Sequence, residues 1–384
     1  MAFDGSAIDQ LLTGAVEHGT YEGVVATVVD RHGVLYEGSA RTASPDTMFR
    51  NASMTKAVAT TAALQLLEQG QIALDQPVEE ILPEFAELQV LEADGSLRPP
   101  ASKATIRQLM THTAGLGYFF LNEGLLTYCG ANGLPSALSG EKAALTAPLI
   151  NDPGTIWEYG VNTDWLGLVV EKVSGQSLGA YLAQHVWGPL NMTDSTFSPS
   201  DEQRSRLMPI RMRAADGSLQ PTDLDLPAEF EWEAGGHGSY GTARDYGRFI
   251  RAWLGDGELD GTRILKPETV ELALQDHIEA IPMPEIMKSC VPELSNDVPS
   301  LPFPQGWGLG FHLTKVDLPG MRSAGTGDWA GIFNTYYWID RSAGVGGAIM
   351  TQILPFFDAK VVEALLGFEV AVYAQVGAAV APIG

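Results

Sequence analysis

The sequence is poor in basic residues and in cysteine. Its 384 residues include 23 lysines and arginines against 47 aspartates and glutamates, so the formal net charge is -24. Nucleic acids and anionic membrane surfaces attract basic patches, and we expect so acidic a chain to bind neither. The two cysteines, Cys129 and Cys290, are not spaced as in a metal site or a redox motif. We expect no metal and no other cofactor.

Long apolar runs are also missing. No stretch of about 18 uncharged apolar residues could cross a membrane. The N-terminus lacks the basic and apolar regions of a signal peptide, which predicts a cytoplasmic location if the chain is complete. Internal repeats and low-complexity tracts are absent. With 45% hydrophobic residues, the chain can bury a sizeable core in one large domain or two.

Local patterns predict helices in the middle of the chain and strands toward its two ends. The predicted helices are residues 6–18, 53–69, 106–111, 164–173, 178–186, 243–254 and 358–376. The predicted strands are residues 24–29, 34–36, 307–313, 331–339 and 345–352. The simplest packing joins both ends of the chain in one antiparallel sheet flanked by helices.

This order of elements predicts two regions with the active site between them. Residues 1–75 and 300–384 would form an α/β region around the central antiparallel sheet. Residues 76–299 would form a mainly helical region inserted between the two halves of the first.

The strongest local signal is Ser53-Met54-Thr55-Lys56, at the start of a predicted helix. Residues three apart lie on one face of a helix, so the Lys56 side chain can reach the Ser53 hydroxyl. No charged residue follows between Ala57 and Leu67, and an apolar setting favours the neutral amine that a base requires. The unpaired N–H groups of a helix start favour developing negative charge. Ser53 is therefore a candidate nucleophile and Lys56 its candidate base.

Two further segments supply candidate partners. Tyr159 follows a Pro-Gly turn and precedes a predicted helix that Thr163 or Asp164 can cap, so its phenol can project into a cleft. A glycine-rich segment ending at Gly331 enters an apolar strand, where the backbone can approach a ligand closely. Taken singly, Ser53-x-x-Lys56 and Tyr159 are better explained by structural roles, a helix cap and a core tyrosine, and the glycine-rich segment also fits an ordinary edge strand.

Together, Ser53-x-x-Lys56, Tyr159 and Trp329-Ala330-Gly331 resemble the serine β-lactamase and penicillin-binding-protein superfamily in order and spacing. They look most like the family VIII carboxylesterases, which share the class C β-lactamase fold. Supporting segments lie at residues 111–116, 178–190, 335–340 and 350–356. The resemblance implies an α+β, β-lactamase/transpeptidase-like fold, with an antiparallel sheet flanked by helices and a mainly helical lobe.

The resemblance also implies roles for individual residues. Ser53 would form the acyl-enzyme, and Lys56 and Tyr159 would share the base and acid roles, with the first base left open. The backbone N–H groups of Ser53 and Ile332 would form the oxyanion hole. Neither a metal nor a cofactor is part of this chemistry.

The sequence departs from the β-lactamase pattern at two places. The third motif of β-lactamases begins with a lysine that helps to hold a substrate carboxylate, whereas here the position is Trp329, as in several esterases. An indole favours an apolar substrate group. Class C β-lactamases carry asparagine where this chain has Val161, and Asn162 follows one position later. We expect the substrate site to contain Trp329, Ala330, Gly331, Asn162 and Tyr118.

These observations predict a serine carboxylesterase that hydrolyses small neutral esters, with acyl transfer as a side activity. The alternative is a β-lactamase or D-amino-acid peptidase of the same fold, which Arg322 or Lys288 would favour by pointing into the pocket. A non-enzymatic penicillin-binding module is a third reading, and the joint presence of the serine, lysine and tyrosine argues against it. The expected partner is a small-molecule ester; the oligomeric state stays open.

Three other residues are weaker candidates for a role in the active site. Ser177 matches the GxSxG pattern of α/β-hydrolases, but it follows a predicted helix instead of a strand, so we interpret it as a helix cap. His112 is interpreted as a structural hydrogen-bonding residue. His237, between glycines, is placed on a flexible loop that could line the pocket, without an assigned role.

Overall fold

The computed structural model describes residues 3–379, and side chains to residue 376. The α-helices are α1 (Ser6–Glu17), α2 (Thr55–Glu68), α3 (Ile106–Met110), α4 (Glu123–Asn132), α5 (Asn162–Ser174), α6 (Leu178–Leu182), α7 (Asp201–Ser205), α8 (Ala243–Leu254), α9 (Pro267–Ala273) and α10 (Ala359–Ala379). A 3₁₀ turn, η1 (Ala52–Met54), precedes α2, and a π-helical turn, Ala183–Trp187, continues α6.

Eighteen strands accompany these helices. They are β1 (Gly23–Asp30), β2 (Val34–Arg41), β3 (Phe49–Arg50), β4 (Val90–Leu91), β5 (Leu97–Arg98), β6 (Arg211–Arg213), β7 (Leu219–Pro221), β8 (Tyr240–Gly241), β9 (Glu258–Leu259), β10 (Thr262–Arg263), β11 (Ile286–Met287), β12 (Val298–Pro299), β13 (Gln305–Trp307), β14 (His312–Thr314), β15 (Gly327–Gly331), β16 (Thr335–Asp340), β17 (Val345–Met350) and β18 (Ile353–Leu354).

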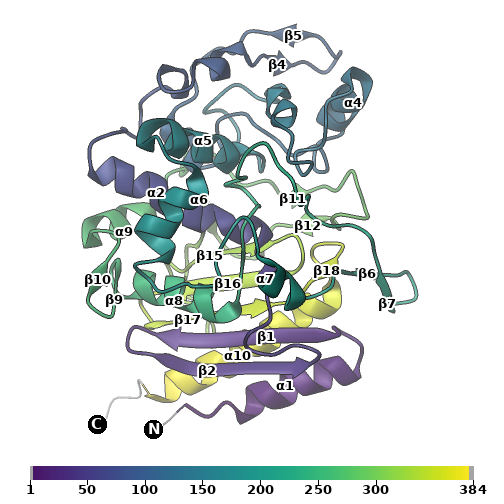
Figure 1. Ribbon diagram of the computed structural model, residues 1–384, viewed down its shortest axis with the longest axis vertical. Helices are drawn as coiled ribbons and strands as arrows, with labels where there is room; N and C mark the ends of the chain where they lie inside the picture. The colour runs from purple at the N-terminus through teal and green to yellow at the C-terminus, as the bar shows by residue number, and fades with distance from the viewer. Residues whose placement is uncertain (1–2, 380–384) are drawn as a thin grey trace.

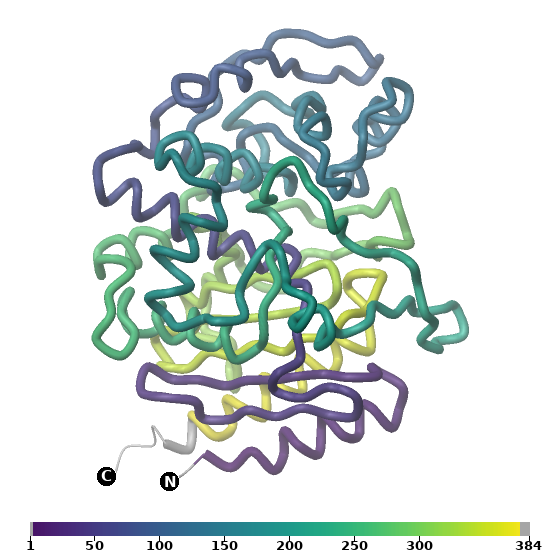
Figure 2. Tube along the Cα trace, in the orientation of Figure 1, coloured from purple at the N-terminus to yellow at the C-terminus, as the bar shows by residue number. Residues whose placement is uncertain are grey.

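The main sheet joins the two ends of the chain. Its seven strands run in the order β13-β14-β15-β16-β17-β1-β2, and every neighbouring pair is antiparallel. The joint lies between β1 and β17, where Thr27 pairs with Ala348. In Figure 2 the purple start and the yellow end of the trace lie together in the same part of the molecule. The predicted α+β fold with a sheet built from both ends is confirmed.

The sheet separates two hydrophobic cores. Side chains alternate across a strand, so Val24, Ala26 and Val28 of β1 enter one core while Val25 and Val29 enter the other. The first core lies between the sheet and helices α1 and α10, which pack together. In Figure 1, α1 lies below β2 and the yellow α10 crosses behind β1 and β2. The second, larger core lies on the opposite face, against α8, α2 and the helical middle of the chain.

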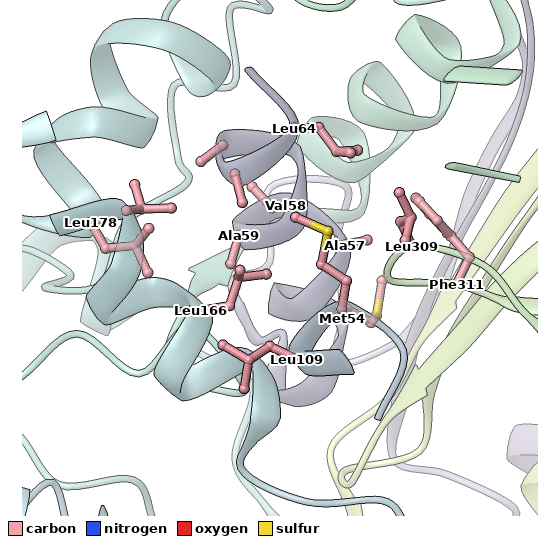
Figure 3. Close-up of a cluster of buried hydrophobic side chains, with 14 of the residues drawn as sticks. Met54, Ala57, Val58, Ala59, Leu64, Leu109, Leu166, Leu178, Leu309 and Phe311 are labelled. Atoms are coloured by element: carbon pink, nitrogen blue, oxygen red, sulfur yellow. The ribbon is translucent and has the colours of Figure 1, made fainter. Parts of the chain in front are cut away.

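Helix α2 runs through the centre of the larger core. Every residue from 55 to 66 is buried, as the charge-free sequence predicts. Figure 3 shows Leu166 and Leu178 on one side of the helix and Leu309 and Phe311 on the other. The helix ends at Glu68, and Gly70 stops it as expected, because its φ of 70° suits glycine. Packing on all sides makes α2 a rigid support for the residues at its start.

Three local predictions were wrong. The expected strand over 307–313 is two short strands, β13 and β14, because the chain turns at Gly310 with φ of 88°. The expected strand over 331–339 likewise breaks into β15 and β16 around Asn334, with φ of 58°. Helix α5 begins at Asn162 without a side-chain cap, so neither Thr163 nor Asp164 caps it. The first two errors arose because a tight turn interrupts an apolar run. The third arose because α5 starts without the side-chain cap that the sequence suggested.

The boundaries of the two regions stay a prediction. All strands of the main sheet come from residues 23–41 and 305–350. However, α8 lies within the segment 76–299 and packs on the sheet against β1 and β17. In the described part of the chain, none of the helices has the length and apolar character needed to cross a bilayer.

Candidate active site

Ser53 lies in the turn η1 directly before α2. The preceding residue, Ala52, has φ of 46°, a left-handed conformation that costs a non-glycine residue about 1–2 kcal/mol. The turn is held from the far side, where Tyr246 Oη donates a hydrogen bond to Met54 O at 2.9 Å. Strained backbone of this kind persists where surrounding contacts determine it, and such places are often functional.

The Lys56 side chain is buried beside Ser53. Its Nζ atom lies 3.0 Å from Ser53 Oγ, 3.1 Å from Tyr118 Oη and 2.8 Å from the carbonyl oxygen of Gly236. Nζ also lies 4.7 Å from the centre of the Tyr159 ring. The predicted contact between Ser53 and Lys56 is therefore present, and the amine has three polar neighbours that fix its position.

The two tyrosines reach the site from adjacent loops. Tyr118 N donates to Tyr159 O at 3.2 Å, and Gly160 permits this approach because a Cβ there would lie 2.5 Å from Gly117 Cα. The phenols have different partners: Tyr118 Oη accepts a hydrogen bond from Lys56, whereas Tyr159 Oη accepts one from Trp329 Nε1 at 2.9 Å. Both tyrosine rings lie next to Lys56 Nζ, but only the Tyr118 phenol is hydrogen-bonded to it.

Burial controls the protonation of two groups around this cluster. It raises the pKa of the Tyr118 phenol well above its ordinary value, and the carboxylate of Asp164 adds to the effect, so the phenol stays neutral. Burial, with the charge of Lys56, holds the pKa of His112 well below its ordinary value. A neutral His112 ring can accept the hydrogen bond that Asn162 Nδ2 offers to its Nδ1 at 3.0 Å.

Asn162 lies beneath the site instead of in its cavity. Its side chain is fully buried and donates to His112 and to Leu116 O. This placement does not support the predicted substrate contact; it fits a role in holding the loop that leads to Tyr118. His112 packs against the Tyr159 ring with centroids 5.0 Å apart, in keeping with its structural interpretation.

Strand β15 brings the second expected oxyanion donor close to the nucleophile. A Cβ at Gly331 would lie 2.5 Å from Asn51 O and 3.2 Å from Ala52 Cβ, so the glycine allows β15 to lie against the turn that carries Ser53. Ile332 follows directly, and both Ser53 and Ile332 line one cavity. Within residues 3–379, neither of these two backbone N–H groups donates to another protein group.

The cavity at Ser53 is small and mainly apolar, with a volume of about 40 Å³. Besides Ser53 and Ile332, its walls contain Tyr118, Phe120, Leu121, Leu138, Tyr159, His237, Met287, Ser295, Val298, Trp329, Ala330 and Phe356. The predicted substrate residues Tyr118, Trp329 and Ala330 thus lie in its wall. Of the described lysines and arginines, none lines this cavity.

A second, larger cavity of about 230 Å³ adjoins the first. The two share Met287, Val298, Trp329, Ala330 and Phe356 in their walls. Arg322 lines only the second cavity, where it is paired with Asp328 at 2.5 Å and with Glu369 at 2.6 Å. Lys288 is exposed and lines neither cavity. The cations that would favour a carboxylate-bearing substrate therefore stay away from Ser53.

Sequence reasoning missed one contributor to the site, the carbonyl oxygen of Gly236, which contacts Lys56. His237 beside it lines the cavity, as the sequence had allowed, and it is buried. The Gly-Gly-His-Gly run was the available signal, since glycine pairs often mark close backbone approach.

Ser177 is the N-cap of α6, where its Oγ accepts from Ala180 N at 3.3 Å, as the sequence predicted. Both cysteines are free thiols.

Comparison with known families agrees with this geometry. The family model described as Beta-lactamase matches residues 8–371. The chain belongs to this β-lactamase family. The predicted superfamily is confirmed, and membership makes the protein a serine hydrolase with a β-lactamase fold.

Relatives of this β-lactamase family member include transferases and an esterase. Monacolin J acid methylbutanoyltransferase of Aspergillus terreus is 34% identical over 348 residues, covering 86% of this chain and 83% of its own. Lovastatin esterase of Penicillium rubens is 30% identical over 384 residues, covering 91% and 93%. The LovD6 mutant of simvastatin synthase from Aspergillus terreus superposes with a TM-score of 0.83 at 29% identity, covering 98% of both chains. The fold thus supports ester chemistry through an acyl-enzyme.

Proposed function

We propose that this protein is a serine carboxylesterase that cleaves small neutral esters through an acyl-enzyme on Ser53, with acyl transfer as a side activity. The observation that carries the proposal is the 3.0 Å contact between Lys56 Nζ and Ser53 Oγ at the edge of an apolar cavity. The names of the relatives, which describe ester hydrolysis and acyl transfer, support the same reaction class.

In the acylation step, Ser53 Oγ attacks the ester carbonyl carbon. Lys56, acting as the neutral amine, takes the hydroxyl proton because it is the basic group in direct contact with Oγ. The bond from the carbonyl carbon to the alcohol oxygen then breaks, and that oxygen takes the proton. We assign Tyr159 as the second residue that handles this proton, because its ring centre lies 4.7 Å from Nζ. The backbone N–H groups of Ser53 and Ile332 would stabilise the negative charge on the carbonyl oxygen.

The cavity wall favours a neutral ester over a β-lactam. A β-lactam antibiotic carries a carboxylate, which a site normally meets with a cation. Trp329 stands where β-lactamases have lysine, and its indole N–H is already directed to Tyr159. Arg322 is neutralised by two carboxylates in the neighbouring cavity.

The second cavity supports acyl transfer. It meets the first at Trp329 and Ala330, so an alcohol seated there would approach the acyl group on Ser53. Its walls are mainly aliphatic and aromatic, which suits an apolar alcohol. Hydrolysis and transfer then differ in whether water or an alcohol attacks the acyl-enzyme.

The test compares turnover of p-nitrophenyl acetate and of a chromogenic cephalosporin by wild type, Ser53→Ala and Ser177→Ala. We expect Ser53→Ala to lower ester turnover by about a thousandfold or more, because removing a nucleophile leaves only the rest of the site. Ser177→Ala is the matched control: it removes a helix cap, costs about 1 kcal/mol of stability and leaves turnover unchanged.

Either of two results would refute the proposal. Activity that survives in Ser53→Ala would remove Ser53 from the reaction. A cephalosporin turned over faster than the ester would assign the protein to the alternative, a β-lactamase or D-amino-acid peptidase.

A further inference from the structure

His237 is a buried histidine in the wall of the cavity that contains Ser53. Its fractional exposure is 6%, and it lies in the same wall as Tyr159 and Ile332. The loop that carries it is ordered by its own hydrogen bonds, since the N–H groups of His237 and Gly238 both donate to Ala234 O. The acylation step described above gives this imidazole no task.

The loop lies against α5 and α2 because two consecutive residues lack side chains. A Cβ at Gly235 would lie 2.7 Å from Thr163 O, and one at Gly236 would lie 2.7 Å from Asp164 Cγ. Gly236 N donates to Asp164 Oδ1 at 2.8 Å while Gly236 O accepts from Lys56. The same two glycines thus bring the Gly236 carbonyl oxygen to Lys56 and place the His237 imidazole in the cavity wall.

Asp164 and His237 form a buried carboxylate–imidazole pair. The Asp164 side chain has no exposure, and its Oδ1 lies 3.5 Å from His237 Nδ1. Among the described residues, Asp164 Oδ2 and His237 Nδ1 have no hydrogen-bond partner. His237 Nε2 also has no partner in the described part of the chain, but it is not among the fully buried atoms, so it is the ring nitrogen with accessible surface.

We propose that His237, oriented by Asp164, is the general base that activates water for hydrolytic release of the acyl group from Ser53. The inference rests on the proposed function, since it requires an acyl-enzyme on Ser53. Lys56 has three polar neighbours, one of them Ser53 Oγ itself, whereas His237 offers the cavity a ring nitrogen that has no partner among the described residues.

In this step His237 Nε2 takes a proton from a water molecule, and the water oxygen forms a bond to the acyl carbon. The bond from the acyl carbon to Ser53 Oγ breaks as the imidazolium returns the proton to Oγ. The products are the carboxylic acid and the free serine. The Asp164 carboxylate stabilises the imidazolium, which would otherwise be a buried and unpaired charge.

The experiment separates acylation from deacylation by stopped-flow kinetics with p-nitrophenyl acetate. The burst of p-nitrophenol reports acylation, and the steady rate that follows reports deacylation. We expect His237→Gln to slow deacylation by about a hundredfold, the usual size of a general-base contribution, with the burst rate changed by less than about threefold. Asp164→Asn should slow deacylation by about tenfold. His32→Gln, an exposed histidine in the turn between β1 and β2, is the matched control and should behave as wild type.

Hydroxylamine distinguishes a base from a merely structural residue. It attacks an acyl-enzyme without needing its proton removed, so it should release the acetyl group from His237→Gln as fast as from wild type. Should His237→Gln fail to fold, as judged by circular dichroism, Asp164→Asn provides the same comparison.

The inference is overturned if His237→Gln deacylates at the wild-type rate. It is equally overturned if acylation, deacylation and hydroxylamine release all slow together, because that pattern indicates a distorted site. A burst that persists in Ser53→Ala would refute the proposed function itself. A burst that Ser53→Ala abolishes, with normal deacylation in His237→Gln, would refute this inference alone.

Discussion

Tyr159 Oη accepts a hydrogen bond from Trp329 Nε1 at 2.9 Å, so the tryptophan at the third motif directly contacts a proton-handling residue. The two rings also pack together, with centroids 5.0 Å apart. A lysine at this position in β-lactamases serves the substrate carboxylate. Here the Trp329 indole donates to the Tyr159 phenol instead. The residue that replaces the lysine therefore helps to position Tyr159.

The first prediction concerns this hydrogen bond. Trp329→Phe keeps an aromatic ring but removes the indole N–H, and we expect kcat/KM for p-nitrophenyl acetate to fall about tenfold, the value of one hydrogen bond of about 1.4 kcal/mol. Trp253→Phe is the control, because Trp253 is buried on α8 and its Nε1 has no hydrogen-bond partner among the described residues. An unchanged kcat/KM in Trp329→Phe would show that the indole does not position Tyr159.

The second prediction separates the two phenols. Tyr159→Phe should lower kcat by about a hundredfold or more, because it removes a group that transfers a proton. Tyr118→Phe should lower kcat only about tenfold, because its neutral phenol serves Lys56 as a hydrogen-bond acceptor. The measurement is steady-state kinetics with p-nitrophenyl acetate. A larger loss in Tyr118→Phe than in Tyr159→Phe would reverse the assignment of the two residues.

The third prediction concerns the glycine whose carbonyl contacts Lys56. In Gly236→Ala the new methyl group would meet the Asp164 carboxylate, so we expect a loss of about 2–3 kcal/mol in the free energy of unfolding, together with reduced activity. The control is Gly130→Ala in α4, where nothing lies within 4 Å and the change should stabilise the helix by about 0.5–1 kcal/mol. Urea unfolding measures both. Equal stability of the two variants would contradict the close approach at Gly236.

The fourth prediction concerns pH. Burial raises the pKa of Glu158, the neighbour of Tyr159, from 4.5 to about 7. Between these values the folded state holds a proton that the unfolded state has released, so stability falls as the pH rises through this window. Glu158→Gln removes this dependence and should be about 2 kcal/mol more stable than wild type at pH 8, with little difference at pH 4. Thermal unfolding at both pH values tests it, and a difference of the same size at both would contradict the buried carboxyl.

The site shows which features local sequence can predict. Ser53 and Lys56 are three residues apart at a helix start, and that spacing alone brings Nζ to Oγ. The apolar run after Lys56 likewise predicted a helix buried on all sides. The partners of Trp329 were beyond such reasoning, since its N–H donates to a tyrosine 170 residues away.

The sequence by itself therefore determined the buried helix that follows the nucleophile and the spacing of the serine–lysine pair, because these depend on periodicity and spacing within one or two helical turns. The fold class followed from the resemblance of the whole set of motifs to a known family. Only the tertiary structure decided which phenol binds Lys56, that Asn162 lies below the cavity, and that His237 reaches its wall beside Asp164. Those placements depend on how loops from distant parts of the chain pack against α2. They are set by close backbone approach at Gly160 and Gly236, and no local pattern encodes it.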